Sequence, residues 1–236
     1  IDVRRAVADP AHDARTNVEG TVNVLEAARV AGTGRVVFSS TGGAIYGEAD
    51  ELPTAEDAAI RPLSPYGQSK FAGEGYLALY ARLHGLSTIS LRYSNAYGPR
   101  QDPLGEGGVA AIFCGKLERG ERPTVFGDGL QTRDYVYVGD IVRANLRAAE
   151  LDVVGTFNIG TGVETTVLQL AEQLAADAAA TASFEPLFEP ERAGEVRRSC
   201  LAAGRAREVL GWSAETDLAS GLRQTLAHVR DDAAVA

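Results

Sequence analysis

The stretch PYGQSKFAGEGYLALYARLHGLSTISLRY, residues 65–93, predicts a helix that is followed directly by a β-strand. The helix covers residues 65–84 and ends before Gly85, since glycine suits the backbone just beyond a helix C-terminus. The short apolar run 87–93 is typical of a buried strand. One helix–strand unit of this kind indicates an α/β protein if the pattern continues on both sides.

The same alternation continues along the chain. Apolar residues at helical spacing predict a helix over 13–32, and the apolar run 35–40 predicts a buried strand. Further helices are expected at 107–120, 138–150, 166–178, 203–211 and 217–230, and further strands at 124–126, 134–138 and 155–160. The sequence therefore predicts a doubly wound parallel sheet with helices on both faces. The segments 42–64, 94–108 and 183–200 are expected to gather where the strands end, at the ligand side of such a sheet.

Composition limits the possible partners. The chain has 236 residues, 45% hydrophobic and 23% charged, which suits one large domain or one domain with a small lobe. Its formal net charge of −9 argues against a nucleic-acid partner, because nucleic acid requires a basic face. Local arginines can still bind an anionic small molecule. No apolar run is long enough for a membrane span, so no membrane partner is expected.

Cys114 and Cys200 are the two cysteines of the chain. Their wide separation predicts neither a metal site nor a disulfide framework, so we expect no metal and a reducing, cytoplasmic location.

Tyr66 and Lys70 form the first candidate for chemistry. The chain has 23 lysines and arginines together, and only Lys70 and Lys116 are lysine. Residues four apart share one face of a helix, so Tyr66 and Lys70 should point the same way. A nearby ammonium favours the phenolate and lowers the pKa of a tyrosine, which would prepare Tyr66 for acid–base catalysis. The alternative is a coincidental pair on a solvated helix.

Three hydroxyls follow the strand at 35–40. Ser39, Ser40 and Thr41 lead into the glycine-rich turn TGGAIYG. Hydroxyls at the carboxyl end of a strand can hydrogen-bond a substrate alcohol, whereas the structural alternative is an ordinary serine or threonine turn.

Six motifs in order resemble one family from residue 1 to about 225. They are NVEGTVNVLEAAR, FSSTGGAIYGE, SPYGQSKFAGE, LRYSNAYGPRQ, FGDGLQTRDYVYVGD and NIGTG. The chain resembles the extended short-chain dehydrogenases, and among them the nucleotide-sugar epimerases of the UDP-glucose 4-epimerase type. The resemblance implies a Rossmann-like fold in which residues 1–95 and 131–160 form the dinucleotide domain. A small C-terminal substrate lobe would then be formed mainly by residues 96–130 and 161–236.

The resemblance also implies the roles of individual residues. Thr41, Tyr66 and Lys70 correspond to the family's catalytic triad. The implied NAD contacts are Asn17, Ser39, Ser40, Tyr66, Lys70 and Tyr93. The implied substrate contacts are Thr41, Asn95, Val109, Arg133, Arg192, Glu195 and Ser199. Independently of the family, arginine suits a diphosphate because its forked guanidinium makes charge-assisted pairs.

A Rossmann fold begins with a strand, a glycine-rich turn and a helix that holds the pyrophosphate. No such fingerprint opens this chain, and NIGTGVETT, residues 158–166, is too late in the sequence, so we interpret it as a structural loop. The chain also contains no methionine. We therefore expect the family's first strands and glycine-rich loop to be missing, and this chain by itself to bind NAD poorly and to be inactive.

The implied reaction is epimerisation at C4 of a UDP-hexose through a 4-keto sugar, with NAD regenerated in place. The related 4,6-dehydratases and decarboxylases need an acid after the threonine, where this chain has Gly42 and Gly43. Other NAD(P)-dependent nucleotide-sugar epimerases or reductases, and a non-catalytic NAD-sensing module, stay open. The small Ser199 is expected to leave room for a 2-acetamido sugar. A homodimer through helices 11–31 and 65–84 is also implied.

Overall fold

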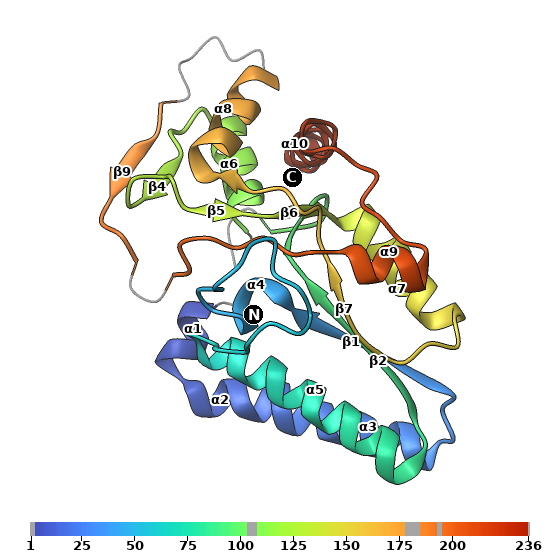
Figure 1. The fold of residues 1–236 in the computed structure, drawn as a ribbon. Coiled ribbons are helices and arrows are strands. Elements are labelled where there is room, and N and C mark those ends of the chain that lie inside the picture. The colour runs from blue at the N-terminus through green and yellow to red at the C-terminus, as the bar shows by residue number, and fades with distance from the viewer. Residues whose placement is uncertain (1–2, 103–107, 178–184, 193–194, 236) are drawn as a thin grey trace.

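The computed structural model describes residues 3–102, 108–177, 185–192 and 195–235. A parallel sheet of three strands runs through it in the order β1–β2–β7 (Figure 1). Its strands are β1 (Arg35–Thr41), β2 (Ser87–Tyr93) and β7 (Gly155–Ile159). Thr41 pairs with Tyr93, and Tyr93 pairs with Ile159, so the carboxyl ends of all three strands lie at one edge. The predicted α/β class is confirmed.

Helices cover both faces of this sheet, as the alternation predicted. On one face, α3 (Gly20–Val30) and α5 (Pro65–His84) bury a core of Leu25, Ala28, Leu77, Tyr80 and Leu86. On the other face, α7 (Val138–Glu150) and α9 (Gly204–Leu210) pack on β2 and β7. Val36 and Phe38 join the first core while Val37 joins the second, which is the alternation of side chains expected along a strand.

The helix predicted over 13–32 is divided in the structure. The helices α1 (Val3–Ala8) and α2 (Pro10–Ala14) lead into a π-helical turn, η1 (Arg15–Glu19), which continues as α3. Asp9 caps α2 by accepting a hydrogen bond from the His12 amide. Such π-turns inside α-helices are rare and often occur at functional sites.

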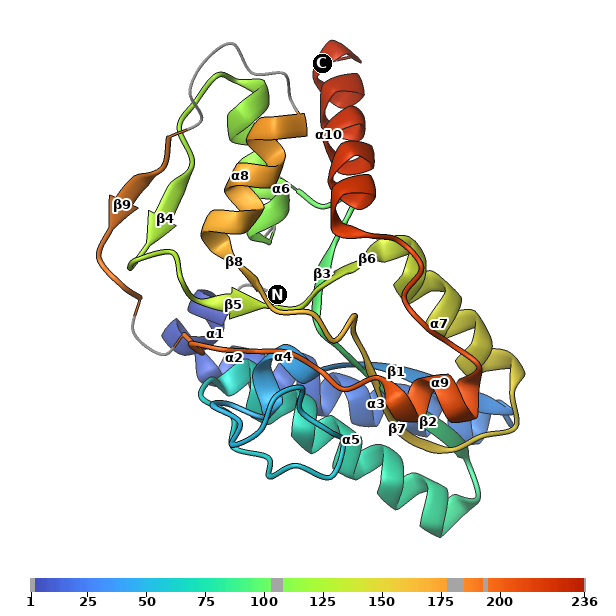
Figure 2. The same ribbon diagram turned by 45° about the horizontal axis from the view of Figure 1, so that its top comes forward.

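The C-terminal part forms a second lobe, drawn at the top of Figure 2. Its core lies between α6 (Val109–Glu118), α8 (Val167–Asp177) and α10 (Leu218–Val235). The short strand pairs beside it and below it are β4 (Thr124–Phe126) with β9 (Leu187–Glu189), β5 (Thr132–Arg133) with β8 (Thr165–Thr166), and β3 (Asn95–Tyr97) with β6 (Tyr135–Tyr137). The predicted domain limits stay a prediction, with one difference: Ala206, Leu210 and Trp212 lie within 161–236 but pack against the sheet.

The loop NIGTG is structural, as expected. It follows β7, and the buried Asp134 carboxylate accepts hydrogen bonds from the Thr161 and Gly162 amides and from the Thr161 hydroxyl. A Cβ on Gly160 would lie 2.4 Å from Asp134 Oδ2, so only glycine fits there. Asp134 also accepts from the Leu201 amide and thereby ties the segment before α9 to the end of β7.

Two glycines of α5 provide a matched test of packing. Gly73 faces the sheet, where an added Cβ would lie 2.8 Å from the Phe38 ring, whereas Gly75 faces open space. We expect Gly75→Ala to stabilise the fold by about 1 kcal/mol, because alanine favours helix. Gly73→Ala should destabilise it by about 1–3 kcal/mol, because the ring must move. Chemical denaturation measures both, and an equal response of the two variants would contradict this packing.

Candidate active site

Thr41 lies where β1 ends and the short helix α4 (Gly42–Ile45) begins. Its backbone is extended and its side chain makes no capping hydrogen bond to α4, so the hydroxyl is not used in an ordinary turn. Instead it lies close enough to the Tyr66 phenol to lower the pKa of that phenol. The structural alternative considered for this threonine is therefore not what the structure contains.

The start of α5 positions Tyr66. Ser64 caps the helix by accepting a hydrogen bond from the Gly67 amide at 3.2 Å, and Pro65 occupies the first helical position. Tyr66 therefore lies in the first turn. A Cβ on Gly67 would lie 2.4 Å from the Ala44 carbonyl oxygen, so the glycine lets α5 approach α4 closely. This close approach brings Tyr66 to Thr41.

Lys70 lies one turn further along α5, on the same face. Its ammonium donates to the Ser39 carbonyl at 2.9 Å and lies 5.0 Å from the centroid of the Phe38 ring. It lies 5.9 Å from the centroid of the Tyr66 ring. Burial lowers the pKa of Lys70, because the ammonium loses part of its hydration. The predicted shared face is confirmed.

The pKa of Tyr66 differs from the expectation. Burial raises it above its ordinary value, the nearby Thr41 hydroxyl lowers it, and the charge of Asp13 raises it. The expected lowering by Lys70 does not prevail, because desolvation of the phenolate is the largest effect and the ammonium is directed at the Ser39 carbonyl.

Ser39 and Tyr93 meet across the paired strands β1 and β2. Their hydroxyl oxygens are 3.1 Å apart, and Tyr93 donates to Asn145 Oδ1 of α7 at 2.9 Å. Asn145 lies in none of the quoted motifs, and the sequence did not predict its contact with Tyr93. Asn17 is buried in the π-turn, and its side-chain amide donates to Asp13.

Ser40 departs from its predicted role. Its side chain points to the opposite face from those of Ser39 and Thr41, and its hydroxyl donates to Glu74 Oε1 at 2.5 Å in the interior. Strand alternation explains this, since neighbouring residues of a strand face opposite sides. The Ser40 hydroxyl is therefore not available to a cofactor.

Glu74 is part of a buried polar network that sequence analysis missed. It lies one turn after Lys70 and pairs with Arg92 of β2, with an N–O distance of 2.7 Å. Arg92 also donates to the Tyr46 hydroxyl, and Tyr46 in turn donates to Asn158 of β7 at 2.9 Å. The only sign of this network in the sequence is that Glu74 follows Lys70 by four residues.

The predicted substrate arginines gather around Glu195. Arg192 lies 3.5 Å and Arg133 lies 3.9 Å from the Glu195 carboxylate. The Arg192 guanidinium also covers the ring of Phe126, 3.4 Å from its centroid. Phe126 and Glu195 line a small surface pocket with Gly127, Gln131, Glu191, Val196 and Arg197. Sequence reasoning did not single out Phe126, although it begins the quoted motif FGDGLQTRDYVYVGD.

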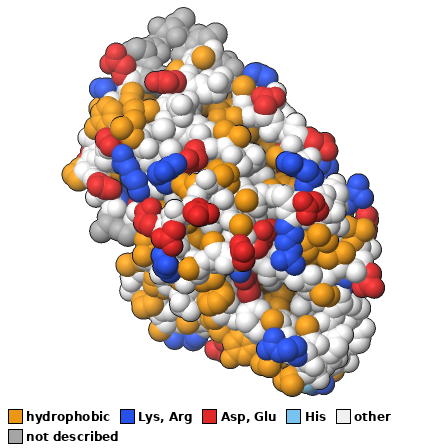
Figure 3. All heavy atoms as spheres, in the orientation of Figure 1, with side chains coloured by type: hydrophobic (Ala, Val, Ile, Leu, Met, Phe, Trp, Pro, Cys, Tyr) orange, Lys and Arg blue, Asp and Glu red, His pale blue; other side chains and the backbone are white. Residues whose placement is uncertain are grey.

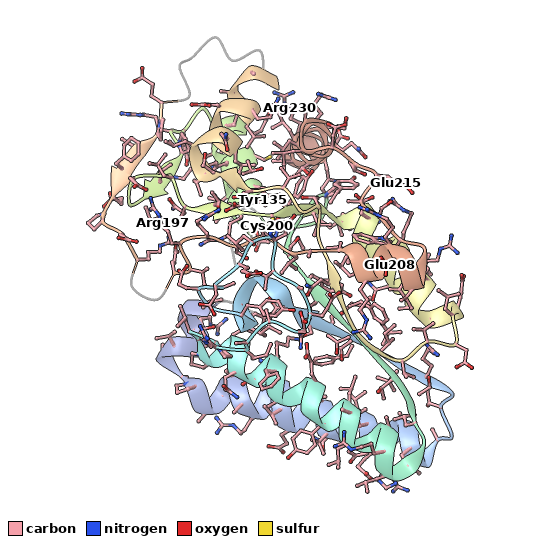
Figure 4. The ribbon with its side chains drawn as sticks, viewed as in Figure 1. Tyr135, Arg197, Cys200, Glu208, Glu215 and Arg230 are labelled. Carbon is pink, nitrogen blue, oxygen red and sulfur yellow. The ribbon has the colours of Figure 1, made fainter. Side chains whose placement is uncertain are left out.

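Neighbouring arginines in this region are also paired. Arg197, labelled in Figure 4, binds both Asp128 carboxylate oxygens at 2.8 Å, and Arg198 binds Glu164. Figure 3 accordingly shows basic and acidic side chains side by side on this face. Arg133 and Arg192 share the single carboxylate of Glu195, whereas Arg197 binds both oxygens of its own carboxylate. Arg133 and Arg192 therefore keep more N–H groups for a further ligand than Arg197 does.

The remaining predicted substrate residues lie on three different elements. Asn95 begins β3, and its side-chain oxygen is buried without a hydrogen-bond partner among the described residues. Ser199 is nearly buried, with its amide bonded to the Thr132 carbonyl, and Val109 begins α6. A Cβ on Gly42 would lie 2.4 Å from Leu201 Cδ1, so the glycine lets the segment that contains Ser199 and Leu201 lie against α4.

Two absences concern only the residues that the structure describes. Among them, no helix is both long and apolar enough to cross a membrane. Likewise, no group of three or more histidine, cysteine or acidic side chains in this part of the chain could hold a metal ion.

A doubly wound sheet with a threonine, a tyrosine and a lysine at the end of one strand defines a Rossmann-type protein with a short-chain dehydrogenase site. Residues 1–160 match the NAD dependent epimerase/dehydratase family. The chain belongs to this family. A UDP-glucose 4-epimerase of Mycolicibacterium smegmatis is 48% identical over 232 residues, which are 98% of this chain and 74% of that protein.

Solved structures give the same result. The UDP-glucose 4-epimerase of Thermotoga maritima with UDP-glucose has a TM-score of 0.95 and 47% identity, over 99% of this chain and 75% of that one. The UDP-glucose 4-epimerase of Thermus thermophilus in complex with NAD has a TM-score of 0.90 and 40% identity, over 98% of this chain and 75% of that one. The match covers both lobes, and the predicted family is confirmed.

The Glu74–Arg92 pair gives a prediction about stability. Glu74→Ala should reduce the free energy of unfolding by about 3–5 kcal/mol, because it leaves the Arg92 guanidinium buried without its counter-charge. The exposed pair of Arg119 and Glu121 supplies the control, and Glu121→Ala should leave the unfolding midpoint unchanged. Urea denaturation measures both variants. Equal effects would mean that burial does not distinguish the two pairs.

Proposed function

We propose NAD-dependent 4-epimerisation of a UDP-hexose of the UDP-glucose and UDP-galactose type as the activity of the protein to which this chain, spanning about three quarters of its relatives' length, contributes the catalytic residues. The observation that carries the proposal is the placement of Thr41, Tyr66 and Lys70 together at the carboxyl end of β1, with the Lys70 ammonium 5.9 Å from the centroid of the Tyr66 ring. The comparisons support it, because the UDP-glucose 4-epimerases described above are 40–48% identical to the chain.

Tyr66 acts as the acid and base in this proposal. Its phenolate accepts the proton of the sugar 4-hydroxyl and later returns it, while the Thr41 hydroxyl orients that oxygen by a hydrogen bond. Bound NAD would supply a reversible hydride acceptor for C4 of the sugar. The burial that raises the pKa of Tyr66 also keeps water away from the reacting atoms.

The residues at the end of β1 and β2 fit a nicotinamide nucleotide. Lys70, Ser39 and Tyr93 place an ammonium and two hydroxyls at one edge of the sheet, a donor set that suits the hydroxyls of a ribose. Asn17 lies in the π-turn beside α5. On cofactor binding, the Lys70 ammonium would donate a hydrogen bond to the ribose, either in place of its bond to the Ser39 carbonyl or in addition to it.

Arg133 and Arg192 would bind the diphosphate of the substrate. In the structure both lie near Glu195, and Arg192 also covers the Phe126 ring. A diphosphate is a stronger partner for a forked guanidinium than one shared carboxylate. Glu195 would then be released to accept hydrogen bonds from the ribose of uridine, the role that the resemblance implies. Asn95, whose side-chain oxygen has no partner among the described residues, would receive a sugar hydroxyl.

A dehydratase is disfavoured by the packing of α4. Elimination needs an added acid directly after Thr41, but a side chain at Gly42 would enter the space of Leu201. A non-catalytic NAD-sensing module is disfavoured because Thr41, Tyr66 and Lys70 are all retained at the carboxyl end of β1. Reduction of bound NAD by a UDP-sugar, followed at 340 nm, distinguishes the enzyme from the module.

Tyr66→Phe tests the proposed acid and base. Turnover of UDP-glucose to UDP-galactose should fall by about 100- to 10,000-fold, because the proton transfer loses its catalyst. Binding of UDP-sugar should persist, since the phenol is not a diphosphate ligand. Tyr76→Phe, on an exposed part of the same helix, is the control and should keep full activity. NMR of the sugar anomeric protons measures turnover in the NAD-loaded protein, and more than a tenth of normal activity in Tyr66→Phe would refute the assignment.

The same assay addresses the choice of sugar. We propose that Ser199, because it is small, permits a 2-acetamido group, so UDP-N-acetylglucosamine should turn over at a rate comparable to that of UDP-glucose. A strict preference for UDP-glucose would remove this proposal and leave the assignment of Tyr66 intact.

We also propose a homodimer through α3 and α5. Val24 and Val30 on α3, and Phe71 and Leu83 on α5, are apolar side chains exposed on the surface of these helices. Exposed apolar residues on two adjacent helices suit a helix-pairing interface.

Phe71→Asp should convert the dimer to a monomer in light scattering coupled to size-exclusion chromatography, because it places a charge in the interface. Leu146→Asp, at a still more exposed apolar position on α7, should leave the dimer unchanged. If the unsubstituted protein is a monomer, or if the two variants change the oligomeric state equally, this interface is excluded.

A further inference from the structure

Asn145 holds Tyr93 from the side of the sheet opposite α5. It is half-buried on α7, which lies on the face of the sheet that α5 does not cover (Figures 1 and 2). Its side-chain nitrogen Nδ2 donates to the Ile141 carbonyl at 2.8 Å, and its oxygen Oδ1 accepts from the Tyr93 hydroxyl at 2.9 Å. A carbonyl can only accept, so the nitrogen must face Ile141 and the oxygen must face Tyr93.

The orientation of Asn145 decides where the phenol proton of Tyr93 lies. Tyr93 has one hydroxyl proton, and that proton is directed at Asn145. The Tyr93 and Ser39 hydroxyl oxygens are 3.1 Å apart, so the proton between them must come from Ser39. The hydrogen bonds therefore form a chain with one direction, from Ser39 to Tyr93 to Asn145. Ser39 and Tyr93 have each used their only hydroxyl proton within this chain.

Ser39 is the end of this chain that a ligand can reach. Its side chain is exposed near the carboxyl end of β1, whereas the Tyr93 ring packs on the core between the sheet and α7. Because its proton is directed at Tyr93, the Ser39 hydroxyl can accept a hydrogen bond from a ligand but cannot donate one. The Lys70 ammonium, which donates to the Ser39 backbone carbonyl, supplies the donor at the same edge. The edge therefore offers one donor and one acceptor.

We propose that Asn145 is a positioning residue of this site, which fixes the Ser39 hydroxyl as a hydrogen-bond acceptor and so selects a ligand group that donates there. That group is an amide N–H or a hydroxyl, and a nicotinamide nucleotide carries both. The inference rests on the proposed function in taking the ends of β1 and β2 as the nucleotide site. A residue that only packed against Tyr93 would not need an amide whose orientation is set by the Ile141 carbonyl.

Neutron diffraction from deuterium-exchanged crystals tests the direction of the chain in the unaltered protein. We expect the Tyr93 deuterium to lie between Tyr93 and Asn145 Oδ1, and the Ser39 deuterium to lie between Ser39 and Tyr93. A Ser39 deuterium directed away from Tyr93 would overturn the proposal. This measurement requires neither NAD nor turnover, so its outcome is independent of whether the protein epimerises sugars. It also requires no variant that could fail to fold.

Calorimetry of NAD binding to the cofactor-free protein tests the positioning role. Asn145→Leu should weaken NAD binding by roughly 3- to 10-fold, the range of one hydrogen bond, because the Ser39 hydroxyl is then free to rotate. With Ser39→Ala already present, Asn145→Leu should have no further effect, because the acceptor on which it acts is gone. Leu146→Ala, at the exposed neighbouring position, is the control and should leave the affinity unchanged. Unchanged affinity in Asn145→Leu, or equal losses with and without Ser39→Ala, would overturn the proposal.

A cofactor analogue identifies which group of the nucleotide donates to Ser39. Acetylpyridine adenine dinucleotide has a methyl group in place of the carboxamide nitrogen of NAD and keeps the ribose hydroxyls. If the amide donates, the preference of the protein for NAD over the analogue should shrink in Ser39→Ala. If a ribose hydroxyl donates, Ser39→Ala should weaken the binding of both nucleotides by the same factor. Unchanged binding of both nucleotides in Ser39→Ala would overturn the proposal.

Discussion

The buried pair of Glu74 and Arg92 is the constraint on which the site depends. Burying two charges is unfavourable unless their geometry and remaining hydrogen bonds are nearly complete, and here Ser40, Tyr46 and the Glu56 carbonyl complete them. Each partner therefore has one permitted position. Because Glu74 lies one turn after Lys70, the pair fixes the rotation of α5 about its axis and, with it, the direction of Tyr66.

The same pair connects α5 to the segment that carries Ser199. Arg92 contacts Tyr46, Tyr46 contacts Asn158 at the end of β7, and the Asn158 side chain donates to the Thr54 and Ala202 carbonyls. Ala202 follows the segment that carries Ser199. A displacement of the substrate segment must therefore strain the network that holds the catalytic helix, since every member is buried and bonded. The network gives the proposed sugar contacts and the proposed acid–base pair a common support.

Local patterns predicted much of this structure. The spacing of Tyr66 and Lys70, the glycine at position 85 and the run 87–93 each depend on neighbouring residues, so α5 and β2 were found at their true limits. Elements of two to four residues, such as α4 and β5, are too short to show a period. The roles of Ser40 and Asn145 depend on which face of a strand or helix meets a distant element, and no short stretch of sequence contains that information.

The pKa of Tyr66 shows why a motif alone does not give a mechanism. A lysine four residues away implies an acidified tyrosine, but burial acts on both groups, raising the pKa of Tyr66 and lowering that of Lys70. Asp13 partly reverses the change at Lys70 and adds to the change at Tyr66. A positively charged nicotinamide beside the phenol would favour the phenolate in turn. The tyrosine would then become a base chiefly when the cofactor is bound, which confines proton abstraction to the state in which the hydride has an acceptor.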